Sequence, residues 1–244
     1  MARDPRVLVV QHQDDCPPAL LGRWLLEAGC VVDIRRPYAG GLPLPLDLAD
    51  HEGLVVLGGS MGANDDEAHP WLLAVKELVR GAAADRKPAL GICLGHQLAA
   101  VALGGAVEPN PVGRQFGVLP MGWTSRAGDD HLLGTLPVTA IHWNDDVVTQ
   151  PPRRAVVLAQ APDGTVQAAR LAETVWGVQC HPEVDEAIVA RWAADERDQI
   201  GADLVDRRLA EMIAAAPVLE AAWQPVATAF AARTRESGGH AVRA

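Results

Sequence analysis

The strongest chemical signal in the sequence is Cys93, in the segment Pro88–Gln97, PALGICLGHQ. An apolar run leads into the cysteine, a helix-like segment 98–103 follows, and glycines lie two residues before and two residues after it. This pattern predicts a sharp strand-to-helix turn, where the nucleophile's backbone is strained and only glycine tolerates the crowding. The helix N-terminus would favour the thiolate. Most free cysteines are small buried hydrophobes, but this frame favours a nucleophile.

A histidine suited to act as general base follows at His181, in the sequence HPE at the end of a predicted strand. His181 would take the proton from the Cys93 thiol and later give it to a leaving amine. Glu183 would accept a hydrogen bond from the other ring nitrogen and fix the tautomer. The alternative role for Glu183 is a carboxylate at the N-terminus of a helix beginning near Asp185, and both roles can hold together.

A glycine-rich loop, Gly58-Gly59-Ser60-Met61-Gly62, follows another predicted strand. The loop lacks the Lys-Ser/Thr pair of a P-loop and a complete Gly-x-Gly-x-x-Gly, so nucleotide binding is disfavoured. Beside a cysteine nucleophile, its better use is an oxyanion hole formed by the backbone N–H groups of Gly59 and Leu94. Loss of one such donor typically costs about 3 kcal/mol of transition-state stabilisation.

The first half of the chain alternates strand-like and helix-like segments. Predicted strands cover 6–10, 30–35, 53–57 and 89–93, and predicted helices cover 18–28 and 70–80. Continuous apolar strands separated by amphipathic helices indicate an α/β fold whose parallel sheet is covered on both faces. Because ligands in such sheets bind beyond the carboxyl ends of the strands, we expect Gly58-Gly59 and Cys93 to face each other.

After Gly105 the pattern changes to short strands, predicted at 107–125, 155–161, 166–170 and 175–180. We expect them to extend the same sheet, partly in antiparallel fashion. From Asp185 the chain is alanine-rich and helical to about Arg233, with a break near Ile200-Gly201, and 237–241 is expected to be a frayed tail. The sequence predicts one domain over 1–244, with its core at 6–200 and C-terminal helices and tail at 201–244.

Composition and charge exclude several classes of function. The formal net charge is −10 without a Lys- or Arg-rich block, so nucleic-acid binding has no electrostatic footprint. The four cysteines, Cys16, Cys30, Cys93 and Cys180, show no spacing typical of a zinc site or a disulfide framework, and no metal is predicted. No apolar run is long and uninterrupted enough for a signal peptide or membrane span. A reducing cytoplasm suits a nucleophilic thiol best.

Together these blocks resemble the class I glutamine amidotransferases, the Cys-His-Glu triad family. The resemblance rests on GICLGHQ at Gly91–Gln97, WGVQCHPE at Trp176–Glu183 and the preceding loop at Gly58, and it covers about residues 6–200. The segment HWND at His142–Asp145 is similar to one in free-standing relatives of the amidotransferase domain of GMP synthetase. The resemblance implies a flavodoxin-like three-layer α/β sandwich with a mostly parallel central sheet, to which antiparallel strands and a C-terminal helical extension are added.

The family implies hydrolysis of the γ-amide of glutamine through a γ-glutamyl thioester on Cys93, which releases glutamate and ammonia without a cofactor. The implied catalytic residues are Cys93, His181 and Glu183, and the implied substrate contacts are Gly58, Ser60, Met61, Gln97 and His142. Two positions depart from the family pattern. Gln115 stands where members often carry Glu, which removes a negative charge expected near the substrate's α-amino group, and Cys180 replaces an aromatic residue behind the histidine.

Several alternatives stay open. The same triad could act on a γ-glutamyl peptide or amine, and a catalytically silent regulatory or binding subunit could keep the fold. Too little chain follows residue 200 for a nucleotide-activating domain, so use of the ammonia would need a separate accepting subunit. The C-terminal helices carry an apolar stripe, which is typical of core but could be a surface for a partner or for a homodimer. Its residues are Leu209, Met212, Ile213, Leu219, Trp223, Val226 and Phe230.

Overall fold

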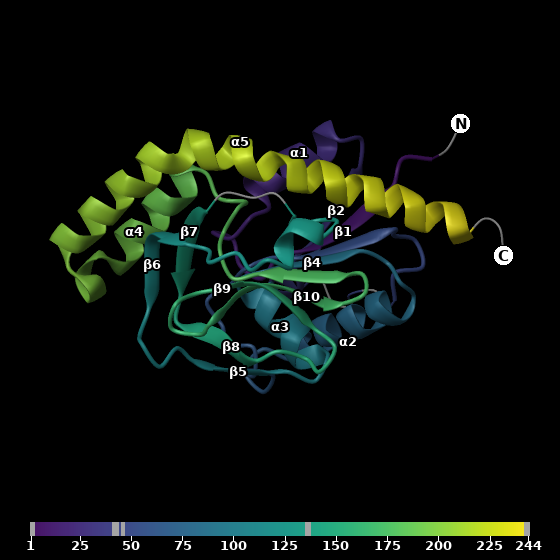
Figure 1. The fold of residues 1–244 in the computed structure, drawn as a ribbon, viewed down its shortest axis with the longest axis horizontal. Coiled ribbons are helices and arrows are strands. Elements are labelled where there is room, and N and C mark those ends of the chain that lie inside the picture. The colour runs from purple at the N-terminus through teal and green to yellow at the C-terminus, as the bar shows by residue number, and fades with distance from the viewer. Residues whose placement is uncertain (1–2, 41–43, 45–46, 135–137, 242–244) are drawn as a thin grey trace.

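The computed structural model describes residues 3–40, 44, 47–134 and 138–241, with side chains described as far as 238. A seven-stranded sheet forms the centre of the molecule, and its first five strands run parallel while the last two are antiparallel (Figure 1). In spatial order the strands are β2 (Val31–Arg35), β1 (Arg6–Val10), β3 (Gly53–Val56), β4 (Ala89–Ile92), β11 (Val175–Val178), β10 (Val166–Ala172) and β9 (Val156–Gln160). The predicted mostly parallel sheet is therefore confirmed.

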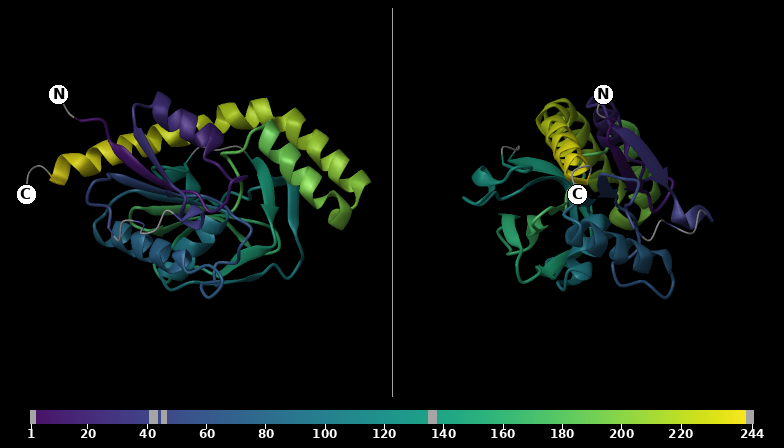
Figure 2. Two further views of the ribbon diagram at one scale, coloured as in Figure 1. Left: turned by 180° about the vertical axis from the view of Figure 1, so that it is seen from behind. Right: turned by 90° about the vertical axis from the view of Figure 1, so that its right-hand side faces the viewer.

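Helices cover both faces of this sheet and make the three layers expected of the fold. One face carries α1 (Ala19–Glu27) and α5 (Ala202–Ala241), and the other carries α2 (Trp71–Ala84) and α3 (Leu94–Ala102). Both views of Figure 2 show the two groups of helices on opposite sides of the strands. The remaining elements are α4 (Glu186–Ile200) and two short 3₁₀ helices, η1 (Pro37–Ala39) and η2 (Ala127–Asp129). In the described part of the chain no helix has the length and apolar character needed to cross a bilayer.

The apolar strands supply side chains to both helical layers. Val7 and Val9 of β1 pack into the hydrophobic cluster that includes Phe230 of α5, whereas Leu8 and Val10 pack into the cluster on the α2–α3 side. Successive side chains of a strand point to opposite faces, so a strand covered on both faces must be apolar at every position. This explains why continuous apolar runs identified these strands in the sequence.

Two small antiparallel sheets are added at the edge of this core. They pair β5 (Ala106–Pro109) with β8 (Asp146–Gln150), and β6 (Gln115–Pro120) with β7 (Thr139–Asn144). The extra antiparallel strands were expected, but the predicted strand at 107–125 is in fact two strands, β5 and β6, separated by a turn. The sequence did not indicate β7 or β8, because short strands that mix apolar with polar residues lack a continuous apolar run.

The C-terminal region is helical farther than the sequence predicts. The break at Ile200-Gly201 is confirmed, since Gly201 has φ 101° between α4 and α5. The expected frayed tail is wrong, because α5 continues to Ala241, beyond which 242–244 lie outside the described residues. Two interior prolines, Pro217 and Pro225, are exposed on this helix. Packing of its other face outweighs their intrinsic cost to the helix.

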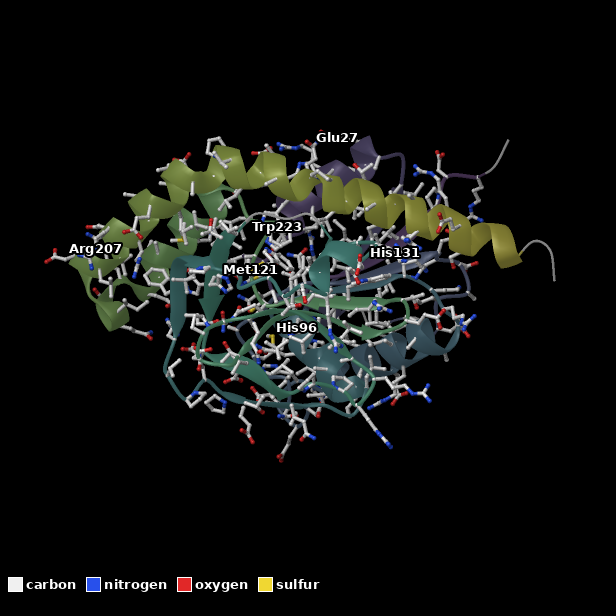
Figure 3. All side chains as sticks on the ribbon, in the orientation of Figure 1. Glu27, His96, Met121, His131, Arg207 and Trp223 are labelled. Atoms are coloured by element: carbon white, nitrogen blue, oxygen red, sulfur yellow. The ribbon has the colours of Figure 1, made fainter. Side chains whose placement is uncertain are left out.

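The apolar stripe on α5 faces the protein itself. Trp223 points from α5 toward the interior, whereas Arg207 points outward (Figure 3). The fully or largely buried members of the stripe are Met212, Leu219, Trp223, Val226 and Phe230, and Leu209 and Ile213 are half-buried. The stripe is therefore core, and it offers no surface for a second copy.

Candidate active site

Cys93 occupies a strained turn between β4 and α3. Its backbone has φ 50° and ψ −107°, in a region where residues other than glycine are rare. A Cβ atom on Gly91 would lie 2.4 Å from the carbonyl oxygen of Gly95, and one on Gly95 would lie 2.0 Å from that of Val56. Both flanking glycines are thus required by close backbone approach, as the sequence predicts. The turn places the thiol at the N-terminus of α3.

His181 and Glu183 form a buried pair beside this thiol. Nδ1 of His181 lies 2.8 Å from Oε1 of Glu183, and both side chains are almost completely buried. Burial by itself lowers the pKa of His181, but the negative charge of Glu183 and the interaction with Cys93, including a hydrogen bond, outweigh it. The net result is a pKa of His181 well above its ordinary value of 6.5. Cys93, His181 and Glu183 therefore lie in one linked arrangement.

Cys93 and His181 line a cavity of about 460 Å³. The cavity lies beyond the carboxyl ends of β1, β3, β4 and β11, the edge at which ligands bind in open α/β sheets. Its wall also includes residues from the loop after β3, the β7–β8 turn and α4. The predicted meeting of the glycine loop and the cysteine turn is confirmed, because Gly59 and Cys93 share this cavity.

The backbone around Gly59 and Leu94 fits an oxyanion hole. A Cβ on Gly59 would lie 3.1 Å from Cδ2 of Leu94, so the two residues are neighbours. No hydrogen bond within the described residues occupies either backbone N–H. The adjacent N–H of Ser60 donates to Oε1 of Gln13 at 2.7 Å, which fixes the loop to the segment after β1.

The predicted substrate contacts fall into two groups. Ser60, Met61 and Gln97 line the cavity. Gly58 does not, but a Cβ there would come within 3.0 Å of Cε1 of His181, so Gly58 permits close packing of that ring. His142 is buried and lies outside the lining, while Trp143 belongs to it. Neighbouring residues of a strand face opposite ways, which explains why Trp143 reaches the cavity and His142 does not.

Gln179 is a further residue at the thiol, and the sequence analysis missed it. Its Nε2 lies 3.6 Å from Sγ of Cys93, and its Oε1 accepts a hydrogen bond of 3.3 Å from Nε2 of Gln97. The same Nε2 of Gln97 donates to the backbone oxygen of Asp146 at 2.9 Å. Because Gln97 donates to Gln179, the amide of Gln179 is oriented with its N–H toward sulfur. The only signal in the sequence was the position of Gln179 two residues before the histidine.

An aromatic wall was also not anticipated. Trp192 of α4 packs on the His181 ring with centroids 4.9 Å apart, and it contacts Trp143 at 5.4 Å. The two indoles cover one side of the base and shield it from water. Cys180, which stands where the family usually has an aromatic residue, is completely buried, and burial raises the pKa of its thiol. Trp192 provides an aromatic ring at the base from another element of the chain.

Gln115 lies in a buried amide network outside the cavity lining. Its Oε1 accepts hydrogen bonds from Asn144 at 3.3 Å and from Gln167 at 3.2 Å. The carboxylates that reach the cavity come from other segments, and they are Asp15, Asp145, Asp146, Asp195 and Glu196. Negative charge is therefore present around the substrate space despite Gln115. Within the described residues no group of His, Cys, Asp or Glu has an arrangement suited to a metal ion.

An α/β sandwich with a cysteine on a strained strand-to-helix turn, next to a hydrogen-bonded His-Glu pair, defines a class of thiol-dependent enzyme architecture. The family described as glutamine amidotransferase class-I matches residues 20–188. The chain belongs to this family.

Relatives and solved structures agree with this assignment. The glutamine amidotransferase-like protein YfeJ of Salmonella typhimurium is 32% identical over 73% of this chain and 75% of its own length. One of the two-part GMP synthases, that of Sulfurisphaera tokodaii, has a glutamine-hydrolysing component that is 32% identical over 57% of this chain and 72% of its own length. The gamma-glutamyl-L-1-hydroxyisopropylamide hydrolase of a Pseudomonas species is 31% identical over 62% of this chain and 54% of its own.

Crystal structures show the same fold over nearly the whole chain. A glutamine amidotransferase from Methylobacillus flagellatus superposes with a TM-score of 0.81 at 27% identity, covering 96% of both chains. One from Thermotoga maritima superposes with a TM-score of 0.83 at 24% identity, covering 96% of this chain and all of its own. The C-terminal helices beyond residue 188 are thus part of a shared architecture.

Proposed function

We propose that this chain hydrolyses a γ-glutamyl C–N bond through a thioester on Cys93, with glutamine as the substrate and glutamate and ammonia as the products. One observation carries the proposal: the strained Cys93 and the hydrogen-bonded His181–Glu183 pair meet at the wall of a single cavity. Strain of this kind persists where the surrounding structure enforces it, and it is common at reactive residues.

In the first half of the reaction, His181 holds the proton of the Cys93 thiol while sulfur attacks the γ-carbonyl carbon. The N–H groups of Gly59 and Leu94 receive the negative charge that develops on oxygen. The C–N bond then breaks, and the leaving amine takes its proton from His181. Glu183 keeps the ring oriented and stabilises its positive charge. In the second half, His181 deprotonates a water, which attacks the thioester and frees the thiol and glutamate.

Gln179 and Gln97 have supporting roles in the proposal. The N–H of Gln179 that points at Sγ stabilises negative charge on sulfur, and Gln97 holds the Gln179 amide in that orientation. Both hydrogens of the Gln97 amide are used by Gln179 and by the Asp146 carbonyl. Only its oxygen is left for the substrate, which suits a donor such as an ammonium or amide N–H. Ser60 and Met61 would shape the opposite side of the substrate space.

A second candidate is hydrolysis of a γ-glutamyl amine or peptide by the same residues. The Pseudomonas relative is named as a hydrolase of such an amide, and the cavity is larger than the ammonia leaving group of glutamine requires. A catalytically silent subunit is disfavoured, because it would not need the strained cysteine together with its paired histidine.

Three further elements belong to the proposal. If glutamine is the substrate, the ammonia passes to a separate protein, since the relative from Sulfurisphaera tokodaii is named as one subunit of a glutamine-hydrolysing synthase. The reaction takes place in the cytoplasm, where a nucleophilic thiol stays reduced. The whole chain forms one domain, because α5 packs along α1 and against the central sheet.

Release of glutamate from glutamine and from γ-glutamyl amides by the purified chain tests the function. We expect turnover that disappears in Cys93→Ala and persists in Cys30→Ser, which changes a buried cysteine outside the cavity. Near-UV circular dichroism should show that both variants are folded. Turnover that survives in Cys93→Ala, or no turnover of any γ-glutamyl compound, would contradict the proposal.

A further inference from the structure

Acidic side chains dominate the outer wall of the cavity, which consists of Asp15, Arg114, Asp145, Asp146, Asp195 and Glu196. These residues come from the segment after β1, the segment before β6, the β7–β8 turn and α4, so the chain brings them together only in the folded state. Five carboxylates face one guanidinium, which gives this wall a formal charge of −4 at neutral pH.

The guanidinium is fully engaged by two of these carboxylates. Arg114 binds both oxygens of Asp145, at 2.7 and 2.6 Å, and also pairs with Glu196. Asp15, Asp146 and Asp195 form no ion pair with any cation in the described part of the chain. Three carboxylates of the outer wall are thus left uncompensated.

Asp146 shows the consequence of this surplus. Burial, followed by the negative charges of Asp145 and Asp65, raises the pKa of the Asp146 carboxyl. The residue is also close to the reaction, because its backbone oxygen accepts from Gln97, which is linked through Gln179 to Cys93. Uncompensated negative charge therefore extends along the cavity to the neighbourhood of the nucleophile. A positively charged group in this space would relieve the repulsion.

Glutamine does not use this charge fully. Its α-ammonium group needs a carboxylate, but its α-carboxylate is repelled by the others, and the molecule as a whole is neutral. Its leaving group is ammonia, whereas a cavity of about 460 Å³ is in the range of roughly 300–1,000 Å³ that holds ligands well above the size of one amino acid. Both the charge and the space remain to be matched by a longer, cationic leaving group.

We propose, on the basis of the γ-glutamyl hydrolysis inferred above, that the preferred substrates are γ-glutamyl amides of a diamine or polyamine, whose free ammonium group is held by the outer wall. Cys93 attacks the γ-carbonyl carbon, the amide C–N bond breaks, and the amine nitrogen leaves with a proton from His181. Water then cleaves the C–S bond of the thioester. One amide and one water give glutamate and one diamine, and no oxidant or other reactant is needed.

The test compares leaving groups of the same length and different charge. The probes are the γ-glutamyl amides of 1,4-diaminobutane (cationic), butylamine (neutral) and 4-aminobutyrate (anionic), with glutamine alongside. We expect kcat/KM at low salt to be at least tenfold higher for the cationic amide than for the neutral one, and lowest for the anionic one. Added salt should reduce the preference, because screening weakens exposed charges. Hydrolysis of the neutral or anionic amide as fast as the cationic one would overturn the inference and leave the proposed function intact.

Variants of the outer wall provide a second measurement. Asp146→Asn and Asp195→Asn should each lower the ratio of kcat/KM for the cationic over the neutral amide by about threefold to tenfold, since each removes one charge. The matched control is Asp198→Asn, an exposed carboxylate on the same helix as Asp195 that does not line the cavity. A ratio unchanged in both wall variants would overturn the inference. No hydrolysis of any of the four compounds by the parent chain would instead contradict the proposed function itself.

Discussion

The outer wall of the cavity and the inner group around the thiol, Cys93, Gln179, His181 and Glu183, are built in opposite ways. Every member of the inner group is buried and bonded to another member. Members of the outer wall are exposed or half-buried, and three of its carboxylates have no cationic partner in the described residues. A buried and mutually satisfied set fixes geometry for chemistry. An unsatisfied, partly hydrated set is suited to select among ligands.

The two regions also differ in their origin within the fold. The inner group lies at the ends of β4 and β11, which are neighbours in the central sheet. The outer wall comes from loops, a turn and α4 at the margin of that sheet. Such segments tolerate change more readily than the strands beneath them. The comparison indicates that the reaction is set by the sheet and that substrate choice is set by the attachments.

The largest expected effect comes from removing the charge of Glu183. In Glu183→Gln we expect kcat/KM to fall about 100-fold or more, because the imidazole loses its orienting carboxylate. Burial would then act alone, so the pKa of His181 should fall and the pH profile of kcat/KM should shift with it. The matched control is Asp185→Asn, which removes the cap of α4 but no contact to the histidine. Equal losses in both variants would mean that Glu183 serves only the helix terminus.

Three buried histidines make the interior sensitive to acid. Burial lowers the pKa of His12 and His142 to about 3 and of His96 to about 4. The unfolded chain takes up their protons below pH 6.5, so the stability they contribute is present above that pH and is lost as pH falls. His181 has the opposite sign, because its raised pKa contributes stability below pH 6.5 that is lost as pH rises.

Each of these four histidines contributes about 2 kcal/mol between pH 7 and pH 5, three against stability and one in favour. Urea unfolding should therefore show a net loss of about 4 kcal/mol between the two pH values. His142→Phe should remove roughly one third of the destabilising part, since neither ring nitrogen of His142 has a hydrogen-bond partner in the described structure. The exposed His131→Asn should change nothing. Stability that is constant or rises from pH 7 to pH 5 would refute this part of the account.

A smaller effect is expected from Gln179, which touches sulfur without being needed for proton transfer. Gln179→Ala should lower kcat/KM about tenfold and slow the alkylation of Cys93 by iodoacetamide at neutral pH, because one N–H donor to the thiolate is lost. Gln167→Ala is the matched control, since it also removes a buried amide but none that contacts the thiol. If both variants slow alkylation equally, the effect comes from the loss of buried packing and the role of Gln179 is refuted.

The smallest effect is expected from the one cation of the outer wall. Arg114→Ala should leave kcat for glutamine within about threefold of the parent chain, because partly exposed ion pairs contribute about 0–1 kcal/mol. It should raise kcat/KM for a cationic γ-glutamyl amide a few-fold, since the wall becomes more negative. Arg197→Ala, which breaks an exposed pair with Asp206 away from the cavity, is the control. A large loss of kcat for glutamine would place Arg114 with the inner group and break the distinction.

The contrast also explains what could be predicted from the sequence. The turn at Cys93 was predictable because its cause is local: Gly91 and Gly95 are required within a few residues of the nucleophile. The pairing of His181 with Glu183 is local as well, two residues apart in the chain. Continuous apolar strands gave the order of the parallel core for the same reason.

Long-range features escaped prediction. The contact of Gln179 with Cys93 joins residues 86 positions apart, and the outer wall gathers several distant segments that look like ordinary solvated charges in the sequence. The frayed tail was wrong because tertiary packing decides it. Thr234 is buried against Gly53, and Arg235 donates to the carbonyl of Ala28, so α5 is held along the sheet edge and α1. Propensity alone contains none of this information.

The central claim is that Cys93 carries the glutamyl group. Rapid acid quenching of the chain with glutamine or a γ-glutamyl amide, followed by mass spectrometry of the proteolysed protein, tests it directly. The account predicts a mass increase of one glutamyl group on the peptide that contains Cys93, lost after mild hydroxylamine treatment, and the same adduct from every substrate that is turned over. Turnover with an unmodified Cys93, or a glutamyl group trapped on another residue, would contradict it.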